Sequence, residues 1–153
     1  MGMELRQGMA LALLGLSVVT PASAQTCRPP TLASLDKAIA TTVATIKSND
    51  APGLLQSFSP EGVLFSIEGE AVSLKNLSEQ FAAKSGRYCD LFTCKGRTGV
   101  LRRKFLGTKI NRQLDAKHGL ASVFINANST DELDLSYKFT RHCTWVLSGI
   151  AAP

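Results

Sequence analysis

Apolar and polar positions follow two different periods along this chain, and the change of period separates a helical first half from a β-rich second half. After Pro29 and Pro30, apolar residues recur at spacings of three and four, which is typical of one face of an α-helix. They are Leu32, Leu35, Ile39, Val43 and Ile46. Thr31 or Ser34 can cap the start of this helix, and the polar run 48–50 ends it.

Shorter elements follow the first helix. A second helix is predicted over residues 52–58, then a turn at 59–62 and a strand over 63–67. The chain turns at 68–70 and begins a brief return strand at 71–72.

A third helix is predicted to begin after Ser73, whose hydroxyl can cap it. Leu74, Leu77 and Phe81 share one face, and the helix ends near Gly86.

From Tyr88 onward the period is two, which favours strands. We expect one long strand over 100–114, a second over 119–127, and a final strand of stronger alternation. In the final strand the apolar face carries Leu133, Leu135, Tyr137, Phe139, Cys143, Trp145 and Leu147, and polar residues lie between them. Helices followed by antiparallel strands predict an α+β fold, in which N-terminal helices pack on one face of the sheet.

The N-terminus has the features of a signal peptide. Residues 9–19 form an apolar run that is shorter than the ~20 residues needed to span a bilayer, and Ala22 and Ala24 supply small residues before Gln25. We therefore expect a signal peptide over 1–24, cleavage near Ala24, and an exported (periplasmic or secreted) single domain over 25–153. A lipoprotein anchored at Cys27 is the weaker alternative, because Thr26 precedes the cysteine. No stable membrane insertion is expected of the mature chain.

Four cysteines lie in the expected mature chain, namely Cys27, Cys89, Cys94 and Cys143. An even number in an exported domain indicates two disulfides, and zinc is disfavoured because only Cys89 and Cys94 are closely spaced. Three pairings are possible. We favour Cys89–Cys94 with Cys27–Cys143, because closing a short loop costs less entropy. We predict no metal site and no cofactor.

The positive charge is concentrated between Lys95 and Lys117, where eight basic residues are opposed by Asp115 alone. Such a stretch could meet an acidic partner, an anionic lipid or nucleic acid. A solvated strand face with a basic loop is the preferred interpretation. No nucleic acid is expected as a partner, because aromatic residues do not interleave with the basic ones.

The order and spacing of elements resemble the NTF2-like superfamily, which includes SnoaL-like and ketosteroid-isomerase-like proteins. The resemblance rests on residues 49–58, 60–65, Gly69 and 72–81, after a long first helix, and on the later strand meander. It implies a strongly curved sheet that wraps on helices and encloses a cone-shaped apolar pocket. The superfamily includes isomerases, dehydratases, ligand-binding and assembly domains, so it implies no single function. We carry over no catalytic residue from those enzymes, because no position of this sequence is matched to their acids, histidines or tyrosines. The Cys89–Cys94 loop and the basic stretch depart from the usual pattern.

Three residues of the final strand are candidates for a ligand site: Tyr137, Arg141 and Trp145. Arg141 falls on the apolar face, where a charge is costly to bury unless it is paired or binds an anion. A strand end, a bulge or a pair with Asp90 would explain Arg141 equally well. Tyr137 and Trp145 could line a pocket or belong to the core.

No catalytic motif is present, so whether this chain is an enzyme is left open. His118 and His142 are the two histidines, and nothing in the sequence brings them together. We expect a small-molecule ligand, partly apolar or anionic, in the cone. An isomerase or dehydratase is one alternative, and a structural or protein-interaction module, with a possible homodimer, is the other.

Overall fold

A computed structural model describes residues 26–66, 69 and 71–153; the predicted signal peptide and most of the predicted turn at 68–70 lie outside the described residues. The helices are α1 (Leu32–Lys47), α2 (Ala51–Ser57), α3 (Leu74–Ala82), α4 (Arg87–Leu91) and α5 (Val100–Phe105). The strands are β1 (Val63–Phe65), β2 (Ala71–Val72), β3 (Thr93–Cys94), β4 (Arg97–Thr98), β5 (Ile110–Asp115), β6 (Leu120–Ile125), β7 (Leu133–Phe139) and β8 (Trp145–Ala151).

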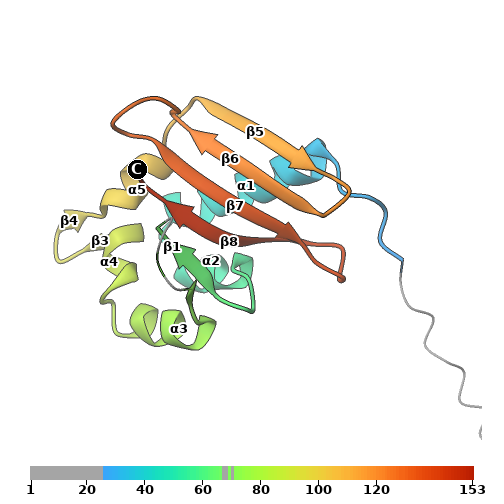
Figure 1. Ribbon diagram of the computed structural model, residues 1–153. Helices are drawn as coiled ribbons and strands as arrows, with labels where there is room; N and C mark the ends of the chain where they lie inside the picture. The colour runs from blue at the N-terminus through green and yellow to red at the C-terminus, as the bar shows by residue number, and fades with distance from the viewer. Residues whose placement is uncertain (1–25, 67–68, 70) are drawn as a thin grey trace, which may run out of the picture.

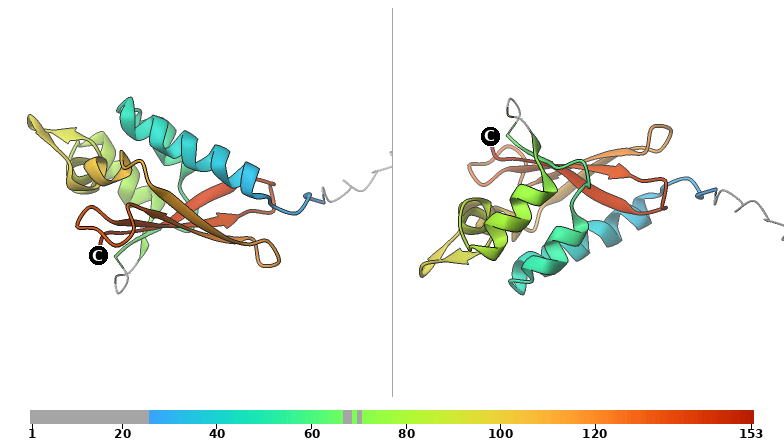
Figure 2. Two further views of the ribbon diagram at one scale, coloured as in Figure 1. Left: turned by 90° about the horizontal axis from the view of Figure 1, so that it is seen from above. Right: turned by 90° about the horizontal axis from the view of Figure 1, so that it is seen from below.

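Six strands form one sheet in the order β2-β1-β8-β7-β6-β5, and β3 and β4 form a separate two-stranded ribbon. Neighbouring strands are antiparallel except β1 and β8, which are parallel, so the sheet is mixed and not wholly antiparallel as predicted. The helices lie over one face of the twisted sheet (Figures 1 and 2). The predicted α+β fold, with its N-terminal helices on the sheet, is confirmed.

The core lies between α1 and the inner face of the sheet. Alternate residues of β7, including Leu133, Leu135 and Tyr137, are buried, and they face Leu35 and Ile39 of the same core. Fully burying one such aliphatic side chain contributes about 1.5–3 kcal/mol. The helical period of three to four residues therefore marks the buried face of α1, and the period of two marks the inner face of the sheet that packs against it.

Three helices begin at side-chain caps. Thr31 and Ser34 form a reciprocal capping box at α1, and Asp50 accepts a bond from Gly53 N at 3.0 Å at the start of α2. Ser73 accepts from Asn76 N at 3.2 Å at the start of α3. The predicted caps Thr31 and Ser73 are confirmed, and each satisfies a backbone N–H that has no partner within its helix.

The prediction of strands from Tyr88 through residue 114 is wrong in two places, because α4 and α5 are helical. Gly99 packs so closely on the carbonyls of Cys89 and Asp90 that a Cβ would not fit, which places α5 directly beside α4. Leu101 and Phe105, four residues apart, then both turn toward the core. The apolar residues of α5 have helical spacing, but the three basic residues between them, 102–104, obscure that spacing in the sequence.

The final strand is also predicted wrongly, because it is a hairpin of β7 and β8. The turn is closed by Thr140 N, which donates to Thr144 O at 2.8 Å, and by Cys143 N, which donates to Thr140 O at 3.0 Å. Phe139 pairs with Trp145 across the hairpin, so beside the turn both strands present odd-numbered residues to the core, until the register shifts between Ser136 and Tyr137. The unbroken alternation in the sequence concealed the turn for this reason.

Candidate functional site

Tyr137 and Trp145 connect the sheet to α1. The Tyr137 hydroxyl donates to Thr42 Oγ1 at 3.0 Å, and Trp145 Nε1 donates to Ser34 Oγ at 2.9 Å. Thr42 and Ser34 in turn donate to the backbone carbonyls of residues 38 and 31. The polar ends of both aromatic residues are thus engaged within the protein, and burial raises the pKa of Tyr137 well above its usual value.

A pocket of about 320 Å³ lies where these two aromatic residues meet the N-terminal half of α1. Its walls are aromatic, small or hydroxyl-bearing, with one cation. They are formed by Ser34, Lys37, Ala38, Thr41, Thr42, Ser57, Tyr137, Phe139, Cys143, Thr144 and Trp145. We call it the helix–sheet pocket.

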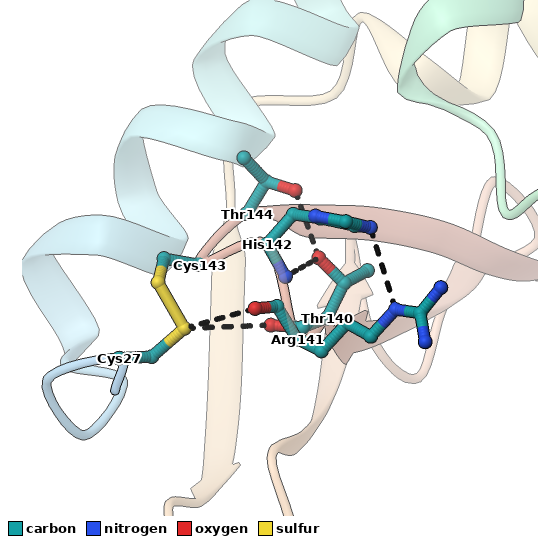
Figure 3. Close-up of a disulfide and its surroundings, with 6 residues drawn as sticks. All are labelled: Cys27, Thr140, Arg141, His142, Cys143 and Thr144. Carbon is teal, nitrogen blue, oxygen red and sulfur yellow. Dashed lines mark hydrogen bonds between the residues drawn. A yellow bond between two sulfur atoms is a disulfide. The ribbon is translucent and has the colours of Figure 1, made fainter. Parts of the chain in front are cut away.

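Arg141 does not line the helix–sheet pocket. It lies in the β7–β8 turn and is exposed, so its predicted position on the apolar face is wrong. Figure 3 shows its side chain directed away from the disulfide, with Nε donating to His142 Nε2 at 3.4 Å. The desolvation cost that suggested an anion-binding role therefore does not arise, and no pair with Asp90 forms, because Asp90 pairs with Arg87.

Two disulfides form in the predicted pairing, Cys27–Cys143 and Cys89–Cys94. Cys27–Cys143 ties the segment before α1 to the β7–β8 turn, and Cys27 Sγ lies 3.4 Å from the carbonyl oxygen of Arg141 (Figure 3). Cys143 adopts a φ of 61°, a backbone conformation that L-residues rarely take. The turn and the disulfide thus fix each other.

Three cations of the basic stretch have structural roles that the sequence did not reveal. Arg102 donates to Asn49 Oδ1 at 2.9 Å and to the carbonyls of Ile46 and Lys47, which caps the C-terminus of α1. Buried Lys104 donates to the carbonyls of residues 130 and 132, and Arg112 pairs with Asp36 of α1 at 2.9 Å. Three of the eight basic residues in this stretch therefore hold elements of the fold together.

The two histidines do not form a joint site. His118 Nδ1 lies 2.7 Å from Asp115 in the β5–β6 turn, and this bond lowers the pKa of Asp115. His142 is exposed in the β7–β8 turn.

Within residues 26–66, 69 and 71–153, no three His, Cys, Asp or Glu side chains are grouped as a metal site. Over the same residues, no helix is both long and apolar enough to cross a membrane.

No protein-family model matches the chain, and no curated protein matches it significantly. Similar solved structures include a ketosteroid isomerase-like protein from Erwinia carotovora atroseptica SCRI1043, 12% identical, with a TM-score of 0.48 over 78% of this chain and 92% of that one. Another is an NTF-2 like protein of unknown function from Shewanella oneidensis MR-1, 12% identical, with a TM-score of 0.42 over 78% and 95%. These likenesses, with TM-scores below 0.5, concern the fold alone.

Proposed function

We propose that this protein is an exported single domain that binds a small, partly apolar and anionic molecule in the helix–sheet pocket. The observation that carries the proposal is the composition of that pocket. Phe139 and Trp145 provide apolar surface beside the buried Tyr137, and hydroxyl groups and one cation lie around them. Ligand pockets commonly combine apolar walls with a few polar groups that orient the ligand.

Lys37 is the cation that could bind an anionic group at this pocket, a role that the sequence suggested for Arg141. Its side chain is on α1 at the pocket, it is exposed, and no ion pair of the described residues includes it. An exposed ammonium group can meet a carboxylate at the pocket entrance without being desolvated. The expected ligand therefore places its apolar part against the aromatic side chains and its acidic group near Lys37.

Binding is favoured over catalysis by the same set of residues. None of the described residues that line the helix–sheet pocket is Asp, Glu or His. Tyr137 is kept protonated by burial, which makes it a poor base. An isomerase or dehydratase would need a proton carrier in contact with its substrate, so that alternative receives less support.

Two alanines of α1 make a matched test of the pocket. Ala38 lines it, whereas Ala40 is exposed and does not. We expect Ala38→Phe to fill the pocket and abolish the thermal stabilisation by medium-chain fatty acids, used as probes, while Ala40→Phe leaves it intact. Lys37→Gln should weaken binding of decanoate but not of decanol. Equal binding by the Ala38→Phe and Ala40→Phe variants, or no thermal shift with any probe, would count against the proposal.

A homodimer remains a prediction, and the face of the sheet that the helices do not cover is where we expect it to form. That face carries no helix of the described residues (Figure 2) and presents the half-buried side chains Leu64, Phe124 and Val146. Sedimentation equilibrium of the wild type and of Phe124→Asp measures it directly: a dimer through this face would dissociate in the variant.

A further inference from the structure

A second hollow lies at the end of the sheet where three distant segments meet. The N-terminal arm, residues 27–30, runs beside the β5–β6 turn and the β7–β8 turn (Figures 1 and 2). Together they line an open groove of about 760 Å³, here called the arm groove. The residues that line it are Cys27, Arg28, Pro29, Pro30, Ala116, Lys117, His118, Gly119, Phe139, Thr140 and Arg141.

The arm groove is positively charged and has no acidic residue in its wall. Each of the three segments contributes one exposed cation, namely Arg28, Lys117 and Arg141. None of the three forms an ion pair with an acid among the described residues. The nearest carboxylate in the sequence, Asp115, pairs with His118 and with none of the three cations.

The groove is also rigid and partly apolar. Pro29 and Pro30 stiffen the arm, and Phe139 with the Cys27–Cys143 disulfide forms its inner wall. Because Arg28 directly follows Cys27, the disulfide holds this cation at the same end of the sheet as Lys117. The arrangement is therefore preorganised, which lowers the ordering cost of binding.

We propose that the arm groove binds a ligand bearing phosphate-type oxyanions, with Arg28 and Lys117 as the main contacts. Two cations from different segments can neutralise a multiply charged group between them. Arg141 stands at the rim, because its side chain is directed toward His142 (Figure 3), and it adds charge to the approach. The apolar wall at Phe139 accommodates the carbon portion of the ligand.

This groove is separate from the helix–sheet pocket. The pocket is lined by Cys143 and the groove by Cys27, so the disulfide and Phe139 form the partition between them. The inference therefore goes beyond the proposed function, and the Ala38→Phe variant should bind phosphate probes like the wild type.

Tripolyphosphate is a suitable probe, and calorimetric titration at several salt concentrations is the measurement. We expect Arg28→Gln and Lys117→Gln each to raise Kd about fivefold, Arg141→Gln to raise it less, and added salt to weaken binding. Lys95→Gln is the matched control, because Lys95 is an exposed cation at the far β3–β4 turn. No binding at physiological ionic strength, or an equal loss with Lys95→Gln, would overturn the proposal.

The disulfide and the source of the oxyanion can be tested with the same probe. Cys27→Ser/Cys143→Ser should weaken binding at least as much as Arg28→Gln, while circular dichroism reports whether the fold is kept; unchanged binding by the folded double variant contradicts the preorganised groove. Sedimentation with phosphatidylcholine vesicles, with and without phosphatidylglycerol, separates the two sources. Binding to the anionic vesicles that tripolyphosphate displaces indicates a lipid headgroup, and tripolyphosphate binding alone indicates a soluble phosphate compound.

Discussion

The Tyr137 hydroxyl donates to Thr42 Oγ1 at 3.0 Å, and this bond joins the central strand β7 to α1 inside the core. Both side chains are almost completely buried, with exposed fractions of 2% and 1%. Thr42 also donates to the carbonyl of Ala38, so its hydroxyl group bonds to its own helix and to the sheet at the same time. This bond fixes the spacing between the two layers at the inner end of the helix–sheet pocket.

Removing the hydroxyl of Tyr137 should lower the free energy of unfolding by about 1 kcal/mol, because a buried hydrogen bond contributes about that much. Urea unfolding of Tyr137→Phe, Thr42→Val and the double variant measures the coupling. The two losses should not add, since either substitution breaks the same bond. Strictly additive losses would show that the bond contributes nothing.

The two disulfides should differ in their effect on stability. Cys27 and Cys143 are 116 residues apart, whereas Cys89 and Cys94 are 5 apart. Loop entropy predicts a loss of about 4–5 kcal/mol for Cys27→Ser/Cys143→Ser and about 2 kcal/mol for Cys89→Ser/Cys94→Ser. Urea unfolding of the two double variants gives the comparison, and a larger loss from the short loop would contradict the entropic account.

Arg102 should stabilise the end of α1, whereas its neighbour should not. Arg102 donates to three groups at the helix C-terminus, and Arg103 is exposed with no hydrogen bond from its side chain among the described residues. We expect Arg102→Ala to lower the free energy of unfolding by about 1–2 kcal/mol, and Arg103→Ala to change it by less than about 0.5 kcal/mol. Similar effects of the two variants in urea unfolding would argue against the cap.

Asp134 should make the protein less stable as the pH rises. Partial burial and the nearby Glu132 raise the pKa of this carboxyl above its usual value, and one of its oxygens has no hydrogen-bond partner among the described residues. A raised pKa in the folded state means that stability is full below the ordinary pKa of 3.8 and falls as the pH passes through the higher folded value.

Asp134→Asn should therefore be more stable than the wild type at neutral pH, and the difference should vanish in acid. Thermal unfolding across the acidic to neutral range measures it, with Asp131→Asn in the exposed turn as the control. A variant that is no more stable at neutral pH would show that the ionised carboxylate carries no penalty.

The sequence predicted those parts of the fold in which a single period is sustained. The stripe of α1, the caps Thr31 and Ser73 and the pairing of the cysteines all follow from local chemistry or chain entropy. The hairpin turn could not be found, because Phe139 and Trp145 face each other and preserve the alternation across it. Arg141 was misplaced for that reason.

The candidate site was predicted only in part. Tyr137 and Trp145 line the helix–sheet pocket, but Lys37 lies on a helix that the sequence marked only by its apolar face. The structural roles of Arg102 and Lys104 depend on carbonyl groups far away in the chain, at residues 46–47 and at 130 and 132. No local pattern records such partners.

The position of β8 between β1 and β7 has a consequence for how the molecule is assembled. β8 joins the early α–β segment to the β5–β7 meander, and its contacts span most of the chain. Such nonlocal pairing slows folding, because the entropy cost of closing the long intervening loop comes before the stabilising contacts between the strands form. The full sheet can therefore form only when β8 pairs with both neighbours. Before that, β1–β2 and β5–β7 are separate sheet fragments, and the edges of β1 and β7 that β8 will cover are unpaired.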